Sequence, residues 1–256
     1  MSKIKPLWIP SEERIRKSNF TEYYEFLRKE YGLTFSNYSE LHSWSVTDIE
    51  TFWESIWKFS GLIHSKPYDK NLDKRIMPDA KWFEGAKLNF AENLLRYRDD
   101  HTAIISSRED KPDVTLTYKK LYDLVSAFSS SLRELGVKEG DRVAGFVTNI
   151  PETIIAMLAV TSLGAIWTSC SPDFGIQGVI DRFGQVKPKL LFAIEEYQYN
   201  GQIINCREKI EEIVHLIPEI EKIIWIPTYQ RLNVNPGDNS KTDIKLDKSL
   251  YFNDLL

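Results

Sequence analysis

Cysteine and histidine, the side chains that most often serve as zinc ligands and that act as nucleophiles or bases near neutral pH, are few in this sequence and widely scattered. They are two cysteines and four histidines: Cys170, Cys206, His42, His64, His101 and His215. None of them lies at the spacing of a zinc-ligand pair, and Cys170 falls in an apolar run where a free thiol packs as a small hydrophobe. The sequence therefore predicts neither a metal site nor a catalytic residue.

The sequence also lacks the glycine-rich loops that bind phosphate in many α/β enzymes. No Gly-x-Gly-x-x-Gly follows an apolar run, and no Gly-x-x-x-x-Gly-Lys-Ser/Thr occurs. Backbone N–H groups in such loops are what a dinucleotide or P-loop site needs. The Gly-x-Ser-x-Gly motif is missing as well. These absences disfavour a dehydrogenase, a P-loop ATPase and an α/β-hydrolase.

Composition narrows the class of protein further. The 256 residues are 42% hydrophobic, which is enough for a packed core, and the formal net charge is -4. An excess of negative charge gives no field to hold a polyphosphate backbone, so we expect no nucleic-acid partner. No run approaches the ~18 apolar residues of a membrane span, and no apolar core follows the first lysines. We therefore expect a cytoplasmic protein without membrane contact.

The elements that would position a site begin with a strand-helix-strand unit between residues 141 and 170. Its apolar runs, residues 141–147 and 165–170, have the length of buried strands. Between them, Pro151 opens a helix that Gly164 ends. Proline at the first helical position loses no hydrogen bond, and glycine after the last turn adopts the left-handed conformation without a clash.

The same alternation continues on both sides of this unit. We expect helices at residues 118–135, 176–186 and 206–216. Further strands are expected at residues 102–106, 114–117, 188–194 and 222–227. Alternating strands and helices are typical of an α/β domain with a mostly parallel sheet. The polar stretch 228–248 has no periodicity and is expected to be a surface loop.

The first 98 residues differ from the rest, because they contain five of the seven tryptophans and no strand with alternating hydrophobicity. We expect helices and loops here, with helices at residues 20–31, 49–60 and 90–97. Thr47 and Glu50 have the spacing of a capping box before the second helix. That helix carries an aromatic stripe, and we expect its Trp53 and Trp57 to be buried where this region packs on the rest of the chain. The expected domains are residues 1–98 and 99–256.

Several of these segments resemble conserved blocks of the adenylate-forming acyl-CoA synthetase superfamily. Leu-Gly-Val-Lys-Glu-Gly-Asp-Arg-Val-Ala, residues 135–144, and Asn-Ile-Pro-Glu, residues 149–152, are similar to its first block, as are residues 157–165. Trp-Thr-Ser-Cys-Ser-Pro-Asp-Phe-Gly, residues 167–175, resembles the acetoacetyl-CoA synthetase branch of that superfamily. Residues 7–14 and 82–95 resemble the beginning of the same enzymes.

The resemblance implies an α/β fold in which a helical, loop-rich N-terminal region packs on the first, incomplete part of the large adenylate-forming domain. It implies an N-terminal portion of a ligase that, at full length, activates acetoacetate with ATP as acyl-AMP and transfers it to CoA. ATP, Mg2+ and CoA are the implied cofactors, and acetoacetate, CoA and the missing C-terminal part of the enzyme are the implied partners. The family's Ser/Thr/Gly-rich phosphate loop has no match here and would follow Leu256. We therefore expect this chain alone to be inactive and to bind none of the cofactors tightly.

Two segments match parts of the family's CoA site. Ser171, Pro172 and Asp173 align with a glycine-rich turn on the pantetheine side. A second set aligns with a segment that supplies arginines to the nucleotide end of CoA in acetyl-CoA synthetases: Tyr199, Asn200, Gly201 and Gln202.

Arginine is absent from this second segment. Tyr199 could stack on an adenine and Gln202 could donate a hydrogen bond, but neither makes the charge-assisted contact of arginine with phosphate. A solvated turn at Asn200-Gly201 is the alternative interpretation. Two alternatives to the leading function also stay open: a stand-alone, non-catalytic binding or assembly module, and a fragment of a related synthetase that uses another short acid.

Overall fold

The computed structural model of the chain describes residues 6–109, 111–227 and 249–256. The chain divides into two compact units, Met1–Leu88 and Asn89–Leu256, and each is described by itself. The polar stretch at residues 228–248, expected to be a surface loop, lies outside the described residues.

In the first unit, the residues that the structure describes, 6–88, form four helices: α1 (Glu12–Arg16), α2 (Asn19–Tyr31), α3 (Tyr38–Thr47) and α4 (Ile49–Ser60). Ser18 begins α2 by accepting a hydrogen bond from the Thr21 N–H, and Gly32 ends it in the left-handed conformation. The stripe on α4 packs with a small core from α2 and α3, whose buried members are Tyr23, Leu27 and Leu41. Two short antiparallel strands, β1 (Lys70–Leu72) and β2 (Trp82–Glu84), follow.

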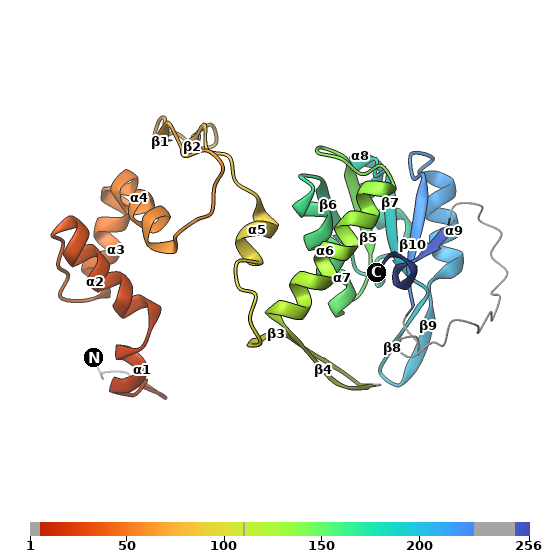
Figure 1. The fold of residues 1–256 in the computed structure, drawn as a ribbon, viewed down its shortest axis with the longest axis horizontal. Coiled ribbons are helices and arrows are strands. Elements are labelled where there is room, and N and C mark those ends of the chain that lie inside the picture. The colour runs from red at the N-terminus through yellow and green to blue at the C-terminus, as the bar shows by residue number, and fades with distance from the viewer. Residues whose placement is uncertain (1–5, 110, 228–248) are drawn as a thin grey trace, which may run out of the picture. The chain divides into compact units, whose positions relative to one another are not determined.

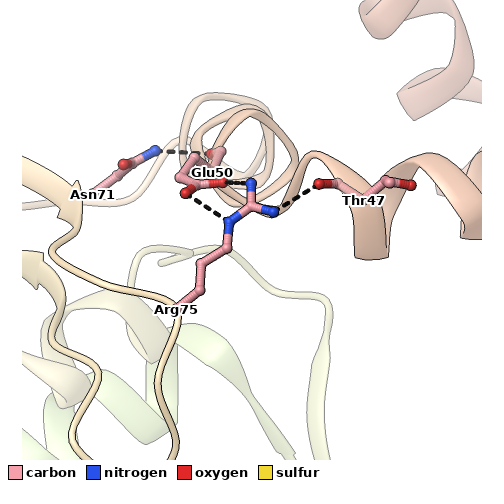
Figure 2. A network of polar contacts seen from close by, with 4 residues as sticks. All are labelled: Thr47, Glu50, Asn71 and Arg75. Carbon is pink, nitrogen blue, oxygen red and sulfur yellow. Dashed lines mark hydrogen bonds and ion pairs between the residues drawn. The ribbon is translucent and has the colours of Figure 1, made fainter.

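The predicted capping box at Thr47 is wrong. Thr47 ends α3, a helix that the sequence did not predict, and Asp48 begins α4 without a side-chain cap. Glu50 is instead held by Arg75, whose Nε donates to Glu50 Oε1 at 2.9 Å and whose second nitrogen pairs with the other oxygen. Figure 2 shows Arg75 also donating to the Thr47 carbonyl, at 3.0 Å, and Asn71 donating to the Glu50 carbonyl, at 2.8 Å. A loop residue thus binds the α3–α4 junction.

The two tryptophans of α4 differ in burial. Trp57 is 9% exposed, and its ring lies 4.9 Å from that of Phe83 and 5.1 Å from that of Tyr68, all within the first unit. Trp53 is 40% exposed. Within the first unit, Trp53 contacts the edge of Trp82. Burial of the two tryptophans against the rest of the chain stays a prediction.

The second unit begins with α5 (Phe90–Leu94), which Asn89 caps by accepting from the Glu92 N–H at 3.0 Å. The same side chain donates to the carbonyls of Thr161 and Ser162. An antiparallel pair, β3 (Thr102–Arg108) and β4 (Lys111–Thr117), leads into the long helix α6 (Tyr118–Glu134).

Among the described residues of this unit, five parallel strands form the central sheet, in the order β11-β10-β7-β5-β6 (Figure 1). They are β5 (Arg142–Phe146), β6 (Ile166–Cys170), β7 (Leu190–Ile194), β10 (Lys222–Ile226) and β11 (Ser249–Tyr251). The crossover helices are α7 (Pro151–Ser162), α8 (Ile176–Val186) and α9 (Arg207–Leu216). The predicted α/β fold with a parallel sheet is confirmed.

The path across the sheet reverses after β6, since the chain returns past β5 to form β7. Right-handed crossovers then put α7 on one face and α8 and α9 on the other. The helix contacts agree, because α6 packs with α7 and α8 packs with α9. All five residues of β7 are buried, as expected of a central strand covered on both faces.

Beyond β7 the chain forms a hairpin that the sequence analysis missed. Its strands are β8 (Glu196–Tyr199) and β9 (Gln202–Asn205). Asn200 and Gly201 form the turn, with φ angles of 51° and 73°. Positive φ at both central residues is the geometry of the tight turn that matches the twist of paired strands, and Asn-Gly is the sequence that favours it. The chain ends in a short 3-10 helix, η1 (Phe252–Leu255), whose Phe252 stacks on Phe128 of α6.

Candidate functional site

An open cleft of about 370 Å³ lies at the carboxyl edge of the parallel sheet. Thr148 and Asn149 line it from the segment after β5, Ser171 and Asp173 from the turn after β6, and Tyr197 and Tyr199 from β8. Strand β5 lies between β6 and β7, so the chain leaves β5 in one direction and β7 in the other. In open α/β sheets this reversal makes the crevice in which ligands bind.

The turn after β6 forms one wall of the cleft and is well ordered by hydrogen bonds. The Phe174 N–H donates to the Ser171 carbonyl at 3.1 Å, which closes the turn. The Ser171 hydroxyl donates to Asp173 Oδ2 at 2.9 Å. Pro172 is buried, and its carbonyl accepts from Lys209 Nζ of α9 at 2.9 Å. The sequence thus places a rigid turn, with one carboxylate, at the end of a buried strand.

Tyr197 joins this wall to the hairpin. Its hydroxyl donates to Asp173 Oδ1 at 2.9 Å, and the residue is 9% exposed. Burial, followed by the hydrogen bond to the Asp173 carboxylate, raises the pKa of Tyr197 to about 12. The phenol therefore keeps its proton and remains a donor throughout the neutral pH range.

The cleft is polar and carries no positive charge. Among the described residues that line it there is no lysine and no arginine, and Asp173 is the one acidic side chain. The remaining polar groups are hydroxyls and amides, from Thr148, Asn149, Thr153 and Gln198 among others. Such groups suit an uncharged chain with amide and hydroxyl groups, whereas a phosphate needs cationic or converging N–H donors. The cleft residues therefore fit an uncharged chain that carries amide and hydroxyl groups, and they do not fit a phosphate.

The second candidate segment lies only partly in the cleft. Tyr199 lines it and is 68% exposed. Asn200, Gly201 and Gln202 form the exposed tip of the hairpin beyond it. The structure therefore brings Tyr199 together with Ser171 and Asp173, and leaves the other three residues at the tip.

The two cysteines lie near the cleft, but neither is suited to act as a nucleophile. Cys170 lines the cleft and Cys206 precedes α9, and both are buried free thiols. Burial raises the pKa of Cys170 and raises that of Cys206 to about 11. Since the thiolate is the reactive form, both remain unreactive thiols near neutral pH. Across the described ranges, no three His, Cys, Asp or Glu side chains gather in a way that could hold a metal ion.

A second cavity, of about 400 Å³, lies in the same unit between α5 and α6. Arg98 and Tyr122 line it, with the guanidinium 4.0 Å from the ring centroid. This cavity is away from the carboxyl edge of the sheet, and its one cation already stacks on an aromatic ring. The cleft at the sheet edge is therefore the better candidate site.

Comparison with protein families assigns the chain. Residues 90–250 match the family model of the AMP-binding enzymes, which is more than half of the chain. The chain belongs to the AMP-binding enzyme family. Residues 38–94 also match the model of the acetyl-coenzyme A synthetase N-terminus. The two matches overlap at residues 90–94, which are the residues of α5.

Individual relatives point to one branch of this family. An acetoacetyl-CoA synthetase of Xenopus tropicalis is 38% identical over 98% of this chain, and the match covers 37% of that protein. The solved structure of acetoacetyl-CoA synthetase from Streptomyces lividans superposes with a TM-score of 0.85 at 35% identity, over 98% of this chain and 38% of that chain. A malonamoyl-CoA synthetase of Penicillium aethiopicum is 39% identical over 81% of this chain and 30% of its own length. This chain thus spans little more than a third of the acetoacetyl-CoA synthetases that it matches.

Part of the cleft lining was not predicted from the sequence, above all Tyr197. The signal was present, because Asn200-Gly201 is a strong hairpin sequence and residues two apart on a strand share a face. Recognising β8 would have placed Tyr197 on the same face as Tyr199. In contrast, Asn149 and Thr153 reach the cleft only because β5 and β7 are neighbours in the sheet, and no local pattern reports that.

Proposed function

We propose that this chain is the N-terminal portion of an acetoacetyl-CoA synthetase, an ATP-dependent acid-thiol ligase. The observation that carries the proposal is the match to acetoacetyl-CoA synthetases along nearly the whole chain, in sequence and in fold. The complete enzyme would join the acetoacetate carboxylate to the α-phosphorus of ATP, with release of pyrophosphate. The CoA thiol would then attack the acyl carbon and release AMP, so that one difficult step becomes two easier ones.

In this proposal the chain supplies framework and part of the CoA path, and none of its residues reacts. The turn at Ser171, Pro172 and Asp173 would border the pantetheine chain, because its hydroxyl and carboxylate are hydrogen-bonding groups in a cleft without cations. Tyr199 at the cleft mouth could stack on the adenine ring. Asn200, Gly201 and Gln202 would lie toward the nucleotide end, and the phosphates would need cations from elsewhere.

Binding of ATP and Mg2+ would depend on residues in the rest of the enzyme. The described residues of the carboxyl edge offer no nest of backbone N–H groups with hydroxyl and lysine donors, which ATP phosphates require. Mg2+ bound together with ATP would supply positive charge that stabilises the adenylation step. Acetoacetate, CoA and the C-terminal part of the enzyme are therefore the partners we propose.

The domain assignment also remains a proposal. Residues 1–98 would be the N-terminal region and residues 99–256 the first part of the adenylation domain. The overlap of the two family matches at α5 supports a boundary near that helix. We propose a cytoplasmic location, in keeping with two free cysteines. Of the helices that the structure describes, none has the length and apolar character needed to cross a bilayer.

The proposal predicts that the isolated chain neither forms acyl-adenylate nor binds ATP with a Kd below about 1 mM. Pyrophosphate release would be followed with acetoacetate, ATP and Mg2+ present, and ATP would be titrated by calorimetry. The full-length Streptomyces lividans enzyme is the positive control. Acetoacetate-dependent pyrophosphate release by this chain alone would overturn the proposal of a non-reacting portion.

Two alternatives have specific tests. A stand-alone binding or assembly module is favoured if the nucleotide sequence beyond the codon for Leu256 has a stop and no frame that encodes a Ser/Thr/Gly-rich loop. An open frame leading to that loop supports the synthetase. A synthetase for another short acid is favoured by the similarity to the malonamoyl-CoA synthetase, and competing acids offered to the complete enzyme would distinguish it.

A further inference from the structure

The two walls of the cleft belong to different elements, and one side-chain hydrogen bond joins them directly. One wall is the turn after β6, and the other is β8, which lies beyond β7. The Tyr197 hydroxyl crosses between them to Asp173 Oδ1 at 2.9 Å. Because this bond has a charged acceptor and a mostly buried donor, it belongs to the stronger class of protein hydrogen bonds.

The turn itself is already fixed from its other side. Lys209 Nζ donates to the carbonyl of Pro172 at 2.9 Å and to that of Phe174 at 3.3 Å. These bonds hold the turn against α9 but make no link to the hairpin. Tyr197 links β8 to this fixed turn, and the length of that link bears on the width of the cleft.

We propose that Tyr197 is a positioning residue that sets the width of this cleft for an uncharged, amide-bearing chain by tying β8 to Asp173. The inference builds on the proposed function in taking pantetheine as that chain. Tyr197 would not touch the reacting atoms. Its hydroxyl occupies one carboxylate oxygen of Asp173 and the Ser171 hydroxyl the other, so the carboxylate is used to hold the walls together.

The test compares pantetheine with adenosine bisphosphate, the two halves of CoA, on the full chain by NMR titration. In the parent chain, pantetheine should shift the amide resonances of Thr148, Ser171 and Asp173 in the cleft, and adenosine bisphosphate should not. Tyr197→Phe keeps the ring and removes the hydroxyl, and it should weaken pantetheine binding about tenfold. Tyr38→Phe, at an exposed tyrosine of the first unit, is the matched control and should change nothing.

Asp173→Asn removes the negative charge of the carboxylate and keeps its hydrogen bonds, so it tests whether the charge or the link to Tyr197 matters for binding. The amide oxygen still accepts from Tyr197, and the amide N–H groups can still donate to the Ser171 hydroxyl, so this variant should bind pantetheine like the parent. Asp173→Ala should weaken pantetheine binding as much as Tyr197→Phe does. The variant that carries both substitutions should bind pantetheine no more weakly than either single variant. If the hydrogen bond served only stability, the substitutions would lower the free energy of unfolding, and their effects on pantetheine affinity would not show this non-additivity.

The results of the titrations distinguish a failure of the Tyr197 positioning role from a failure of the pantetheine assignment. If pantetheine shifts the cleft resonances and Tyr197→Phe binds it as well as the parent does, the positioning role is overturned while the site stands. If pantetheine shifts none of these resonances in the parent, the pantetheine assignment fails. In that case amide exchange at Asp173 and Phe174 still tests positioning, since unchanged exchange in Tyr197→Phe would overturn it.

Discussion

Arg75 shows how one side chain can fix a junction that has no local cap. It binds both carboxylate oxygens of Glu50 and the Thr47 carbonyl, where the sequence suggested a capping box (Figure 2). Thr47 and Glu50 have the correct residue types and spacing for that motif. The longer-range partner replaces the local one because a guanidinium forms a two-pronged bond with a carboxylate, which a backbone N–H cannot match.

This ion pair predicts a pH dependence. The side-chain hydrogen bond from Arg75 lowers the pKa of Glu50 below its ordinary value of 4.5. A group whose pKa is lowered on folding stabilises the fold above its unfolded pKa, and that contribution is lost as the pH falls through the folded pKa. Urea unfolding of the full chain, followed by tryptophan fluorescence, should therefore show stability falling less steeply below about pH 5 in Arg75→Gln than in the parent.

Lys17→Gln is the matched control for that experiment. Lys17 pairs with Glu13 at 2.7 Å on α1, and both side chains are largely exposed, so the pair should contribute little. Identical pH profiles for Arg75→Gln and the parent would show that the Arg75 contact does not stabilise the folded chain.

At the scale of elements, a glycine of β5 leaves space for the ring of a tryptophan on the neighbouring strand β6. A Cβ atom added to Gly145 would lie 2.7 and 2.8 Å from two ring carbons of Trp167 on the neighbouring strand. Glycine in a strand usually weakens it, and here it makes room for a large ring close to the backbone. The segments that follow β5 and β6 line the cleft, so the pairing of these two strands also positions the cleft lining.

Gly145→Ala should therefore destabilise the second unit by about 1 to 3 kcal/mol, because the ring cannot move without disturbing its packing on Phe192. The free energy of unfolding in urea measures this. Gly184→Ala in α8 is the opposite case, since a Cβ there meets no atom within 4 Å. It should be neutral or stabilising by up to about 1 kcal/mol. An equal effect of both substitutions would contradict the close approach at Trp167.

Elements with a strong local pattern could be predicted from the sequence. The helix from Pro151 and the strand at β7 were found because Pro, Gly and apolar spacing report directly on backbone conformation. Helix α3 was missed because its apolar residues barely segregate to one face and Asn37 was not recognised as its cap. Hairpin β8–β9 was missed although its Asn-Gly turn was seen, because its strands are only four residues long.

At the scale of the whole molecule, sequence order does not determine which strands are neighbours. The cleft exists because β7 pairs with β5 rather than with β6. That choice follows from the reversal of the path across the sheet, which no periodicity encodes. Family resemblance pointed to Ser171 and Asp173 as candidate site residues, and the packing of β8 brings Tyr197 beside them, although it lies 24 positions from Asp173 in the sequence.

The central claim is that this chain can serve as the N-terminal portion of an acetoacetyl-CoA synthetase. The most direct measurement is pyrophosphate release by a chimera in which this chain replaces the matching 38% of the Streptomyces lividans enzyme. The proposal predicts release that depends on acetoacetate, at a rate within about a hundredfold of the parent enzyme, since small misplacements at the joined surface can cost that much. A folded chimera that releases no pyrophosphate with acetoacetate, while the parent enzyme does, would contradict it.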